Sequence, residues 1–255
     1  MDLMANNLRE INSLNQRGGR MLSVVDLIED GTLDAPTSGL LLSFMAAGAS
    51  FLTAAGPGGV GKTTLMAVLL SFLPPEERLR TVTDPGDVKA PSEPTCWLCH
   101  EIGAGHWFGY LWGAEAAQFL ALQSSGRIAG SLHADTDEEV AAQLLGPRVG
   151  TAEEDLAAID LLLTMVRVGG MRRVNTVYES VGGGGPEFRP VVEWDRGMDR
   201  FASTRSEHLE RMKQSARGPV PSVTQATEFI EGLVARDVRS LEGVMQNVAQ
   251  FYDEL

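Results

Sequence analysis

Residues 49–70 constrain the fold of this chain more than any other stretch. An apolar run at 49–55 leads into the loop Gly-Pro-Gly-Gly-Val-Gly-Lys-Thr-Thr, and a second apolar run follows at 65–70. The pattern Gly-x-x-x-x-Gly-Lys-Thr between a strand-like run and a helix-like run is typical of a phosphate-binding P-loop. A glycine-rich turn that precedes a lysine by coincidence would lack these flanks. The sequence therefore predicts a nucleotide-binding protein of the α/β class.

Each residue type in this loop has a physical role. Glycines let the backbone curl so that its N–H groups point inward at phosphate oxygens, and the helix that begins near Gly61 adds the positive end of its dipole. Lys62 is expected to reach the β- and γ-phosphates, and the Thr63 hydroxyl is expected to bind Mg²⁺. We assign the nucleotide-binding loop to Gly56, Pro57, Gly58, Gly59, Val60, Gly61, Lys62, Thr63 and Thr64.

The length and the net charge of the chain further limit the classes of protein to which it can belong. A chain of 255 residues with 44% hydrophobic residues can bury a sizeable core in one or two domains. The net charge of −13 argues against a protein that holds nucleic acid, because phosphate neutralisation needs a basic surface. The sequence shows no signal peptide, and its longest apolar run, 39–49, is too short to span a bilayer. We therefore expect a cytoplasmic protein.

Two cysteines form the segment Cys96-Trp97-Leu98-Cys99-His100. The pattern Cys-x-x-Cys-His is the attachment signature of c-type haem, which requires export. It could also supply half of a zinc site, but no second ligand pair follows at a suitable spacing. A redox pair would more often lie at a helix N-terminus than on a strand. We expect ordinary buried cysteines on an apolar strand.

The remaining pattern predicts alternating helices and strands. Residues 1–20 are polar and are interpreted as an extended N-terminal arm, residues 21–200 as the α/β domain and residues 201–255 as a C-terminal helical region. Ser23 is a plausible N-cap for the first helix and Gly31 its stop. Helices are expected at 24–30, 36–47, from the P-loop to Pro74-Pro75, and at 114–124, 135–145, 152–158, 205–215, 221–235 and 238–252. Strands are expected at 50–55, 79–83, 95–102, 128–132, 161–166, 171–181 and 188–194.

The order of these features resembles the type II/type IV secretion ATPase superfamily, in particular the branch that drives tight-adherence pili and archaeal pili and flagella. Four stretches carry the resemblance: 20–33, which resembles the linker into the ATPase domain; 56–78, the Walker A loop and its helix; 130–136, Gly-Ser-Leu-His-Ala-Asp-Thr, a histidine box; and 224–252, a helical tail. The resemblance implies a RecA-like P-loop NTPase core, with ATP and Mg²⁺ as ligands. It also implies a hexameric ring, or a hetero-oligomer with a related ATPase, that works with an inner-membrane platform protein.

The same resemblance suggests site residues beyond the P-loop. His133 would sense the γ-phosphate, and it follows a strand at the edge where open α/β sheets bind ligands. Asp84 and Asp87 would help to hold the Mg²⁺ shell, although Thr83 replaces one acid of the family's Asp box. A lone histidine after an apolar strand is otherwise often a hydrogen-bonded core residue. Arginines at 167, 172 and 173 are either fingers that reach across a subunit interface or charges on a solvated hairpin.

The catalytic acid is the main departure from the family pattern. Family members have an apolar strand followed by Gly-Glu and a further acid, and we align this Walker B segment with residues 107–116. In that alignment Tyr110 stands where a glutamate should orient the attacking water, and a phenol is no substitute at neutral pH. Glu115 either takes over this role or only caps the next helix. If this alignment is wrong, Glu101 and Asp87 are the next candidates for the catalytic acid. The chain also has only about twenty residues in place of the family's additional N-terminal domain.

The sequence therefore leaves two main hypotheses for function. The first is a motor ATPase of the secretion or pilus-assembly type, located in the cytoplasm or peripherally at the inner face of the membrane, that hydrolyses ATP weakly. The second is a nucleotide-binding but catalytically inactive assembly or regulatory subunit that pairs with an active ATPase. A third reading, a P-loop ATPase of the partition or transport type, has no support from the histidine box.

Overall fold

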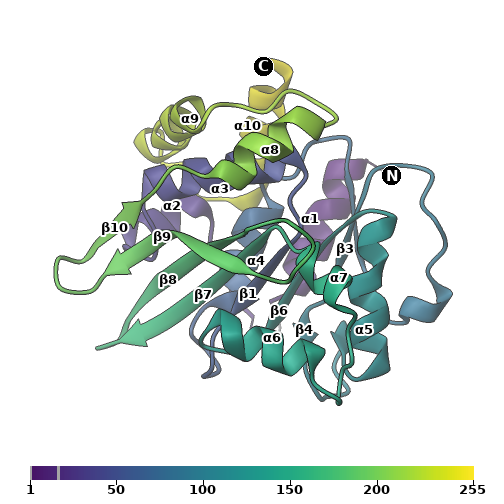
Figure 1. Cartoon of the computed structure of the whole chain (residues 1–255). Helices are drawn as coiled ribbons and strands as arrows, with labels where there is room; N and C mark the ends of the chain where they lie inside the picture. The colour runs from purple at the N-terminus through teal and green to yellow at the C-terminus, as the bar shows by residue number, and fades with distance from the viewer. Residues whose placement is uncertain (1, 16–17) are drawn as a thin grey trace.

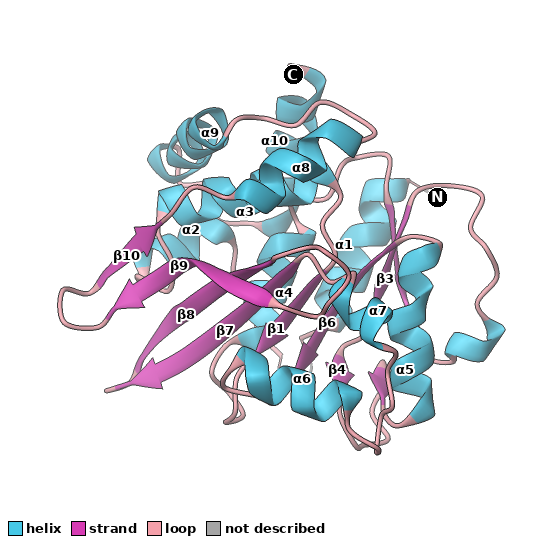
Figure 2. Ribbon diagram, viewed as in Figure 1, coloured by secondary structure: helices cyan, strands magenta, loops and turns pink. Residues whose placement is uncertain are grey.

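The structure, a computed structural model, describes residues 2–15 and 18–255. Within these residues ten strands form one mixed sheet with helices on both faces (Figure 1, Figure 2). The strands are β1 (Phe51–Ala54), β2 (Arg78–Thr81), β3 (Thr95–Leu98), β4 (Glu101–Ile102), β5 (Tyr110–Leu111), β6 (Arg127–Leu132), β7 (Leu161–Val168), β8 (Met171–Ser180), β9 (Phe188–Asp195) and β10 (Arg200–Ser203).

The helices alternate with these strands through most of the chain. They are α1 (Leu3–Ser13), α2 (Val24–Glu29), α3 (Ala35–Ala47), α4 (Lys62–Leu70), α5 (Ala114–Ala121), α6 (Asp137–Leu145), α7 (Glu153–Ala157), α8 (Glu207–Ser215), α9 (Val223–Ala235) and α10 (Leu241–Asp253), with short 3₁₀ turns η1 (Pro85–Asp87) and η2 (Leu122–Ser124). The α/β class predicted from the sequence is confirmed.

The sheet places the P-loop strand at its centre. Five neighbouring strands, in the order β7-β1-β6-β3-β2, run parallel, and β8, β9 and β10 extend the sheet antiparallel beyond β7. The short strand β4 pairs with β6, and β5 pairs with β4. Because parallel strands end at the same edge, the segments that follow β1, β4 and β6 meet there, where open α/β sheets bind ligands.

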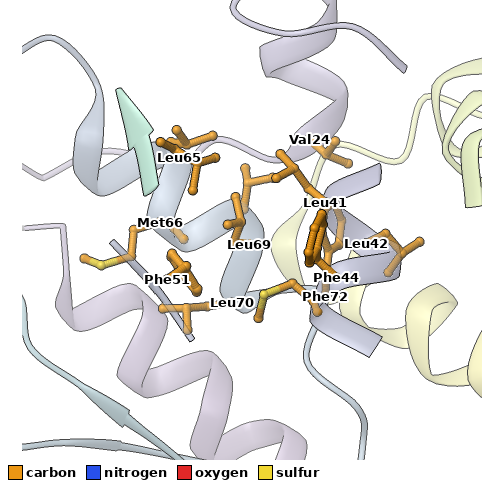
Figure 3. Packing of buried hydrophobic residues seen from close by; sticks show 14 of the residues in the cluster. Val24, Leu41, Leu42, Phe44, Phe51, Leu65, Met66, Leu69, Leu70 and Phe72 are labelled. Atoms are coloured by element: carbon orange, nitrogen blue, oxygen red, sulfur yellow. The ribbon is translucent and has the colours of Figure 1, made fainter. Parts of the chain in front are cut away.

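Strand residues alternate between two apolar cores, one on each face of the sheet. On β1, Phe51 packs into the core under α3 and α4, whereas Leu52 packs into the core under α5, α6 and α7. On β3, Cys96 and Trp97 divide in the same way. This alternation follows from the period of two in a strand, and burial on both faces explains the nearly continuous apolar sequence of β1 and β7. Figure 3 shows part of the first core, where Phe51 lies beside Met66 and Leu70 of α4, and Leu41 and Leu42 of α3 lie beyond Leu69.

The first twenty residues are not an extended arm, so that prediction is wrong. Residues 3–13 form α1, which lies against the outer edge of β2. The Asn7 side chain donates to the Glu77 carbonyl (2.7 Å) and accepts from the Leu79 N–H (2.8 Å), and the Glu10 carboxylate accepts from the Thr81 N–H (3.1 Å). These bonds satisfy backbone groups that an edge strand would otherwise expose.

Three further boundaries differ from the sequence-based prediction. Helix α4 ends at Leu70, before Pro74-Pro75, and the expected strand 95–102 is interrupted at Cys99 and His100. Strands β5 and β10 were not predicted, and the proposed helical region 201–255 begins inside β10. The three C-terminal helices are present: α9 packs on α3, and the Tyr252 hydroxyl donates to the Phe72 carbonyl (2.8 Å). Ser23 caps α2 with a full capping box, as predicted.

Candidate functional site

A cavity of about 570 Å³ opens at the carboxyl edge of the parallel strands. Its floor is the P-loop, and Glu101 and His133 line one part of the wall. Met21 and Leu22, between α1 and α2, line another part, and Arg172 on β8 lies opposite. Residues from several separate stretches of the chain therefore meet around the segment that the sequence predicts to bind phosphate.

The P-loop backbone has the conformation that its glycines allow. Gly59 (φ +79°) and Gly61 (φ +121°) lie in the left-handed region, which other residues rarely adopt. Val60 between them is buried and anchors the loop to the core. Helix α4 begins at Lys62, so its free N–H groups and dipole face the cavity. Gly58 through Thr64 line the cavity, whereas Gly56 and Pro57 lie outside its lining.

Lys62 is the buried cation of this site. Its ammonium nitrogen lies 3.4 Å from Glu101 Oε1 and 3.2 Å and 3.3 Å from the two ring nitrogens of His133. Burial lowers the pKa of Lys62, and the neighbouring Glu101 carboxylate opposes that shift. The ammonium group is therefore held at the P-loop by a carboxylate, in the position that a phosphate-binding lysine needs.

Glu101 is the buried acid of the site, and sequence analysis named it only as a second choice. It starts β4, and its Oε2 accepts a 2.7 Å hydrogen bond from the Ser131 hydroxyl on β6. Its Oε1 is buried and lies 3.4 Å from the Lys62 ammonium and 3.4 Å from His133 Nε2. A water molecule fits such an oxygen, with the Thr63 hydroxyl on the same cavity wall.

The acid that lies beside the P-loop lysine is Glu101, outside the segment 107–116 that we aligned with Walker B. The apolar strand beside β6 is β3, and the chain reaches Glu101 three residues after β3 ends. The segment 107–116 instead contains β5, which has two residues and pairs only with β4. Tyr110 lines the same cavity. The signal that could have identified Glu101 was the apolar run 95–99 followed by a single acid.

His133 and Asp135 hold the start of the P-loop between them. His133 Nδ1 lies 2.7 Å from the Gly56 carbonyl oxygen, which requires a proton on Nδ1 and leaves Nε2 as the acceptor toward Lys62. The Gly56 N–H donates to Asp135 Oδ1 (2.7 Å), and the Asp135 N–H donates to the Glu139 carboxylate (2.7 Å). His133 therefore lies in the cavity, as the sequence predicts, in a fixed orientation.

The remaining predicted residues lie elsewhere. Glu115 is exposed on the first turn of α5, and Asp84 and Asp87 are exposed in and beside η1, where Asp84 Oδ1 accepts from the Gly86 N–H (2.9 Å). None of these three lines the cavity. Throughout residues 2–15 and 18–255, no group of three or more His, Cys, Asp or Glu side chains gathers into a metal site. The structure thus brings together Lys62, Thr63 and His133 but not the three acids.

The cysteine pair carries no site. Cys96 and Cys99 are free and buried, on opposite faces of the sheet, and burial raises the pKa of both thiols. His100, between Cys99 and Glu101, is also buried, and burial lowers its pKa to about 4. Its Nε2 lies near the hydroxyls of Ser13 (3.4 Å) and Thr81 (3.3 Å), so the histidine connects α1 to the wall of the cavity.

Comparison with known proteins gives distant structural similarities. No family model and no curated protein matches the chain. The VirB11 ATPase of the Brucella suis type IV secretion system, solved with sulphate, is 18% identical over 67% of this chain and 55% of that one, with a TM-score of 0.39. The Legionella pneumophila ATPase DotB is 14% identical over 80% of this chain and 58% of that one, with a TM-score of 0.35. The chain thus spans little more than half of each.

One further property bears on location. Among the residues that the structure describes, no helix is long and apolar enough to cross a membrane.

Proposed function

We propose that this protein has a RecA-like P-loop core that binds ATP with Mg²⁺ and hydrolyses the γ-phosphate bond. The observation that carries the proposal is the grouping of Lys62, Glu101 and His133 within 3.4 Å of one another beside the P-loop. The parallel strands support it, because β1, β4 and β6 deliver the P-loop, Glu101 and His133 to one edge of the sheet. Cation, carboxylate and histidine are the parts that phosphoryl transfer to water requires.

Each residue of the site has its own proposed role in ATP binding and hydrolysis. Lys62 exchanges its contact with Glu101 for the phosphate oxygens, which releases the Glu101 carboxylate to orient a water molecule and accept its proton. The Thr63 hydroxyl would hold Mg²⁺, which when bound neutralises charge on the phosphates. His133, fixed through Nδ1 to Gly56, presents Nε2 to the region of the γ-phosphate. Leu22, Leu27 and Met165 provide an apolar wall suited to the base.

The biological role that we propose is motor activity in protein secretion or pilus assembly, at the inner face of the membrane. This part rests on the resemblance of the linker, P-loop, histidine box and helical tail to secretion ATPases. It includes assembly into a hexameric ring, or with a related ATPase, and coupling to an inner-membrane platform protein. The inactive-subunit hypothesis depends on a missing catalytic glutamate, and the position of Glu101 beside Lys62 favours an active enzyme over it.

Nucleotide binding by paired lysine variants tests the proposal. Lys62→Ala removes the cation beneath the phosphates and should weaken binding of Mg·ATP at least about 100-fold, because charge-assisted contacts to several oxygens are lost. Lys89→Ala, an exposed lysine in the loop after η1, removes the same charge and should leave binding unchanged. Calorimetric titration measures both. Equal affinities for Lys62→Ala and the wild-type protein would contradict the proposal.

A further inference from the structure

The β7–β8 hairpin brings a second cation to the cavity. Arg172 lies near the start of β8, its side chain is exposed, and it lines the cavity that contains the P-loop. Its Nε donates a long hydrogen bond of 3.4 Å to the Gly59 carbonyl, inside the P-loop itself. A Cβ atom placed on Gly61 would lie 3.4 Å from Arg172 Cδ, so the arginine stem also packs against the loop. This contact is made within one chain.

The charge of Arg172 has no structural use. No ion pair among the described residues includes it. The next residue, Arg173, is buried and pairs with Asp199 at 2.9 Å, so that arginine holds the fold. Of the carboxylates on the cavity wall, Asp26 pairs with Arg20 (2.7 Å) and Glu101 lies next to Lys62. The third, Asp30, accepts from the Thr32 hydroxyl (3.2 Å). Arg172 is thus a cation at the mouth of the site that is free to meet an anion.

The sheet order determines which part of a nucleotide Arg172 would meet. β7 and β8 lie on one side of β1, and β6 and β4 lie on the other. Lys62 and the reacting end of the site, Glu101 and His133, belong to the β6 side. Arg172 approaches the P-loop from the β7 side, at Gly59 and Gly61. It therefore faces the phosphates that precede the γ-phosphate, which ADP and ATP share.

We propose that Arg172 is a second phosphate-binding residue of this site, which moves from the Gly59 carbonyl to the α- and β-phosphates of nucleotide bound to its own chain. This inference rests on the proposed function. Exchange of a long bond to a neutral carbonyl for charge-assisted bonds to phosphate is favourable, and the planar guanidinium fork suits two phosphate oxygens. Arg172 is thereby a positioning residue for the nucleotide, in contrast to a finger that reaches a neighbouring subunit.

The hairpin offers a matched control. Arg167 is the direct cross-strand partner of Arg172, is also exposed, and does not line the cavity. Arg167→Ala and Arg172→Ala therefore remove the same charge from the same hairpin, and both variants should keep the wild-type melting temperature because neither side chain is buried. Long-range electrostatic effects should be similar in the two, so a difference between them reports direct contact.

The experiment is a titration of both variants with Mg·ADP and Mg·ATPγS, followed by calorimetry. We expect Arg172→Ala to weaken both nucleotides by similar factors of roughly 10 to 100, Arg172→Lys to recover part of the loss, and Arg167→Ala to stay within about twofold of the wild-type protein. Equal affinities for Arg172→Ala and Arg167→Ala would overturn the inference, as would a loss confined to Mg·ATPγS. Wild-type protein that binds neither nucleotide would overturn the proposed function as well.

Discussion

Two regions of the molecule, the one around Glu101 and the one around Glu115, differ sharply in the surroundings that they give to an acid. Glu101 is buried, with its side chain 9% exposed, and is held by Ser131 on one oxygen and next to Lys62 on the other. Glu115 lies on the exposed first turn of α5, outside the cavity. An acid at the start of a helix is explained by the helix dipole alone. Glu101 differs in that it lies beside the P-loop lysine and lines the cavity.

Substitution of these two acids should change the steady-state rate of ATP hydrolysis very differently, and this is the largest effect that we expect. Glu101→Gln should reduce turnover by roughly 10²–10⁴, which is the usual contribution of a group that accepts a proton from the attacking water. Glu115→Gln should stay within about twofold of the wild-type rate, since this carboxylate touches no part of the cavity. A coupled phosphate-release assay measures both. If Glu115→Gln hydrolyses ATP more slowly than Glu101→Gln does, the role that we propose for Glu101 is wrong.

His100, the buried neighbour of Glu101, should make the free energy of unfolding depend on pH. Its pKa in the folded protein is lowered to about 4 by burial, against about 6.5 when unfolded. The unfolded state then binds more protons between these values, so this contribution to stability is complete above pH 6.5 and is lost as the pH falls toward 4. Up to about 3 kcal/mol of unfolding free energy is involved.

Urea unfolding between pH 7 and pH 4.5 measures this effect. His100→Gln should show a shallower loss of stability than the wild-type protein over that interval. His106→Gln, at an exposed position in the loop between β4 and β5, should follow the wild-type curve. Parallel curves for His100→Gln and the wild-type protein would mean that the wall beside Glu101 is not closed to solvent.

Disruption of the contact between Gly56 and Asp135 should have a smaller effect on the free energy of unfolding. A Cβ on Gly56 would lie 2.3 Å from Asp135 Oδ2, so Gly56→Ala forces that carboxylate away and breaks its bond to the Gly56 N–H. We expect a loss of roughly 1–2 kcal/mol in unfolding free energy. Asp135→Ala removes the clash, so the double variant should cost less than the sum of the two single changes. Strictly additive unfolding free energies would show that the two residues are not in contact.

Much of the fold follows from the sequence. The P-loop, the burial of β1 and β7 on both faces, and the place of His133 depend on local patterns that tertiary contacts reinforce. Helix α1 was missed because its apolar residues are few among polar ones, and its stability comes from bonds to the edge of β2. Met4, Leu8 and Ile11 do recur at helical spacing and pack against the core, but this short pattern was not recognised among the polar residues.

Glu101 was not the first choice from the sequence for a different reason. Cys99 and His100 interrupt the strand that carries Glu101, so the apolar run ends before the acid. The aromatic residues at 107–112 resemble a strand more closely, yet only Tyr110–Leu111 pairs with another strand. Arg172 could not be placed from sequence either, because only the return of the β7–β8 hairpin brings it to Gly59. Contacts of this kind depend on topology and not on spacing along the chain.

A single-turnover measurement with Glu101→Gln tests the central claim most directly, namely that Glu101 acts on water and is not needed to hold ATP. The variant is mixed with radiolabelled ATP in enzyme excess, Mg²⁺ is added, and product is quenched over time beside the wild-type protein. We predict that Glu101→Gln binds ATP at least as tightly as the wild-type protein, because Lys62 no longer faces a competing carboxylate. Its bound ATP should be cleaved roughly 10²–10⁴ times more slowly. Cleavage of bound ATP at the wild-type rate would contradict the account.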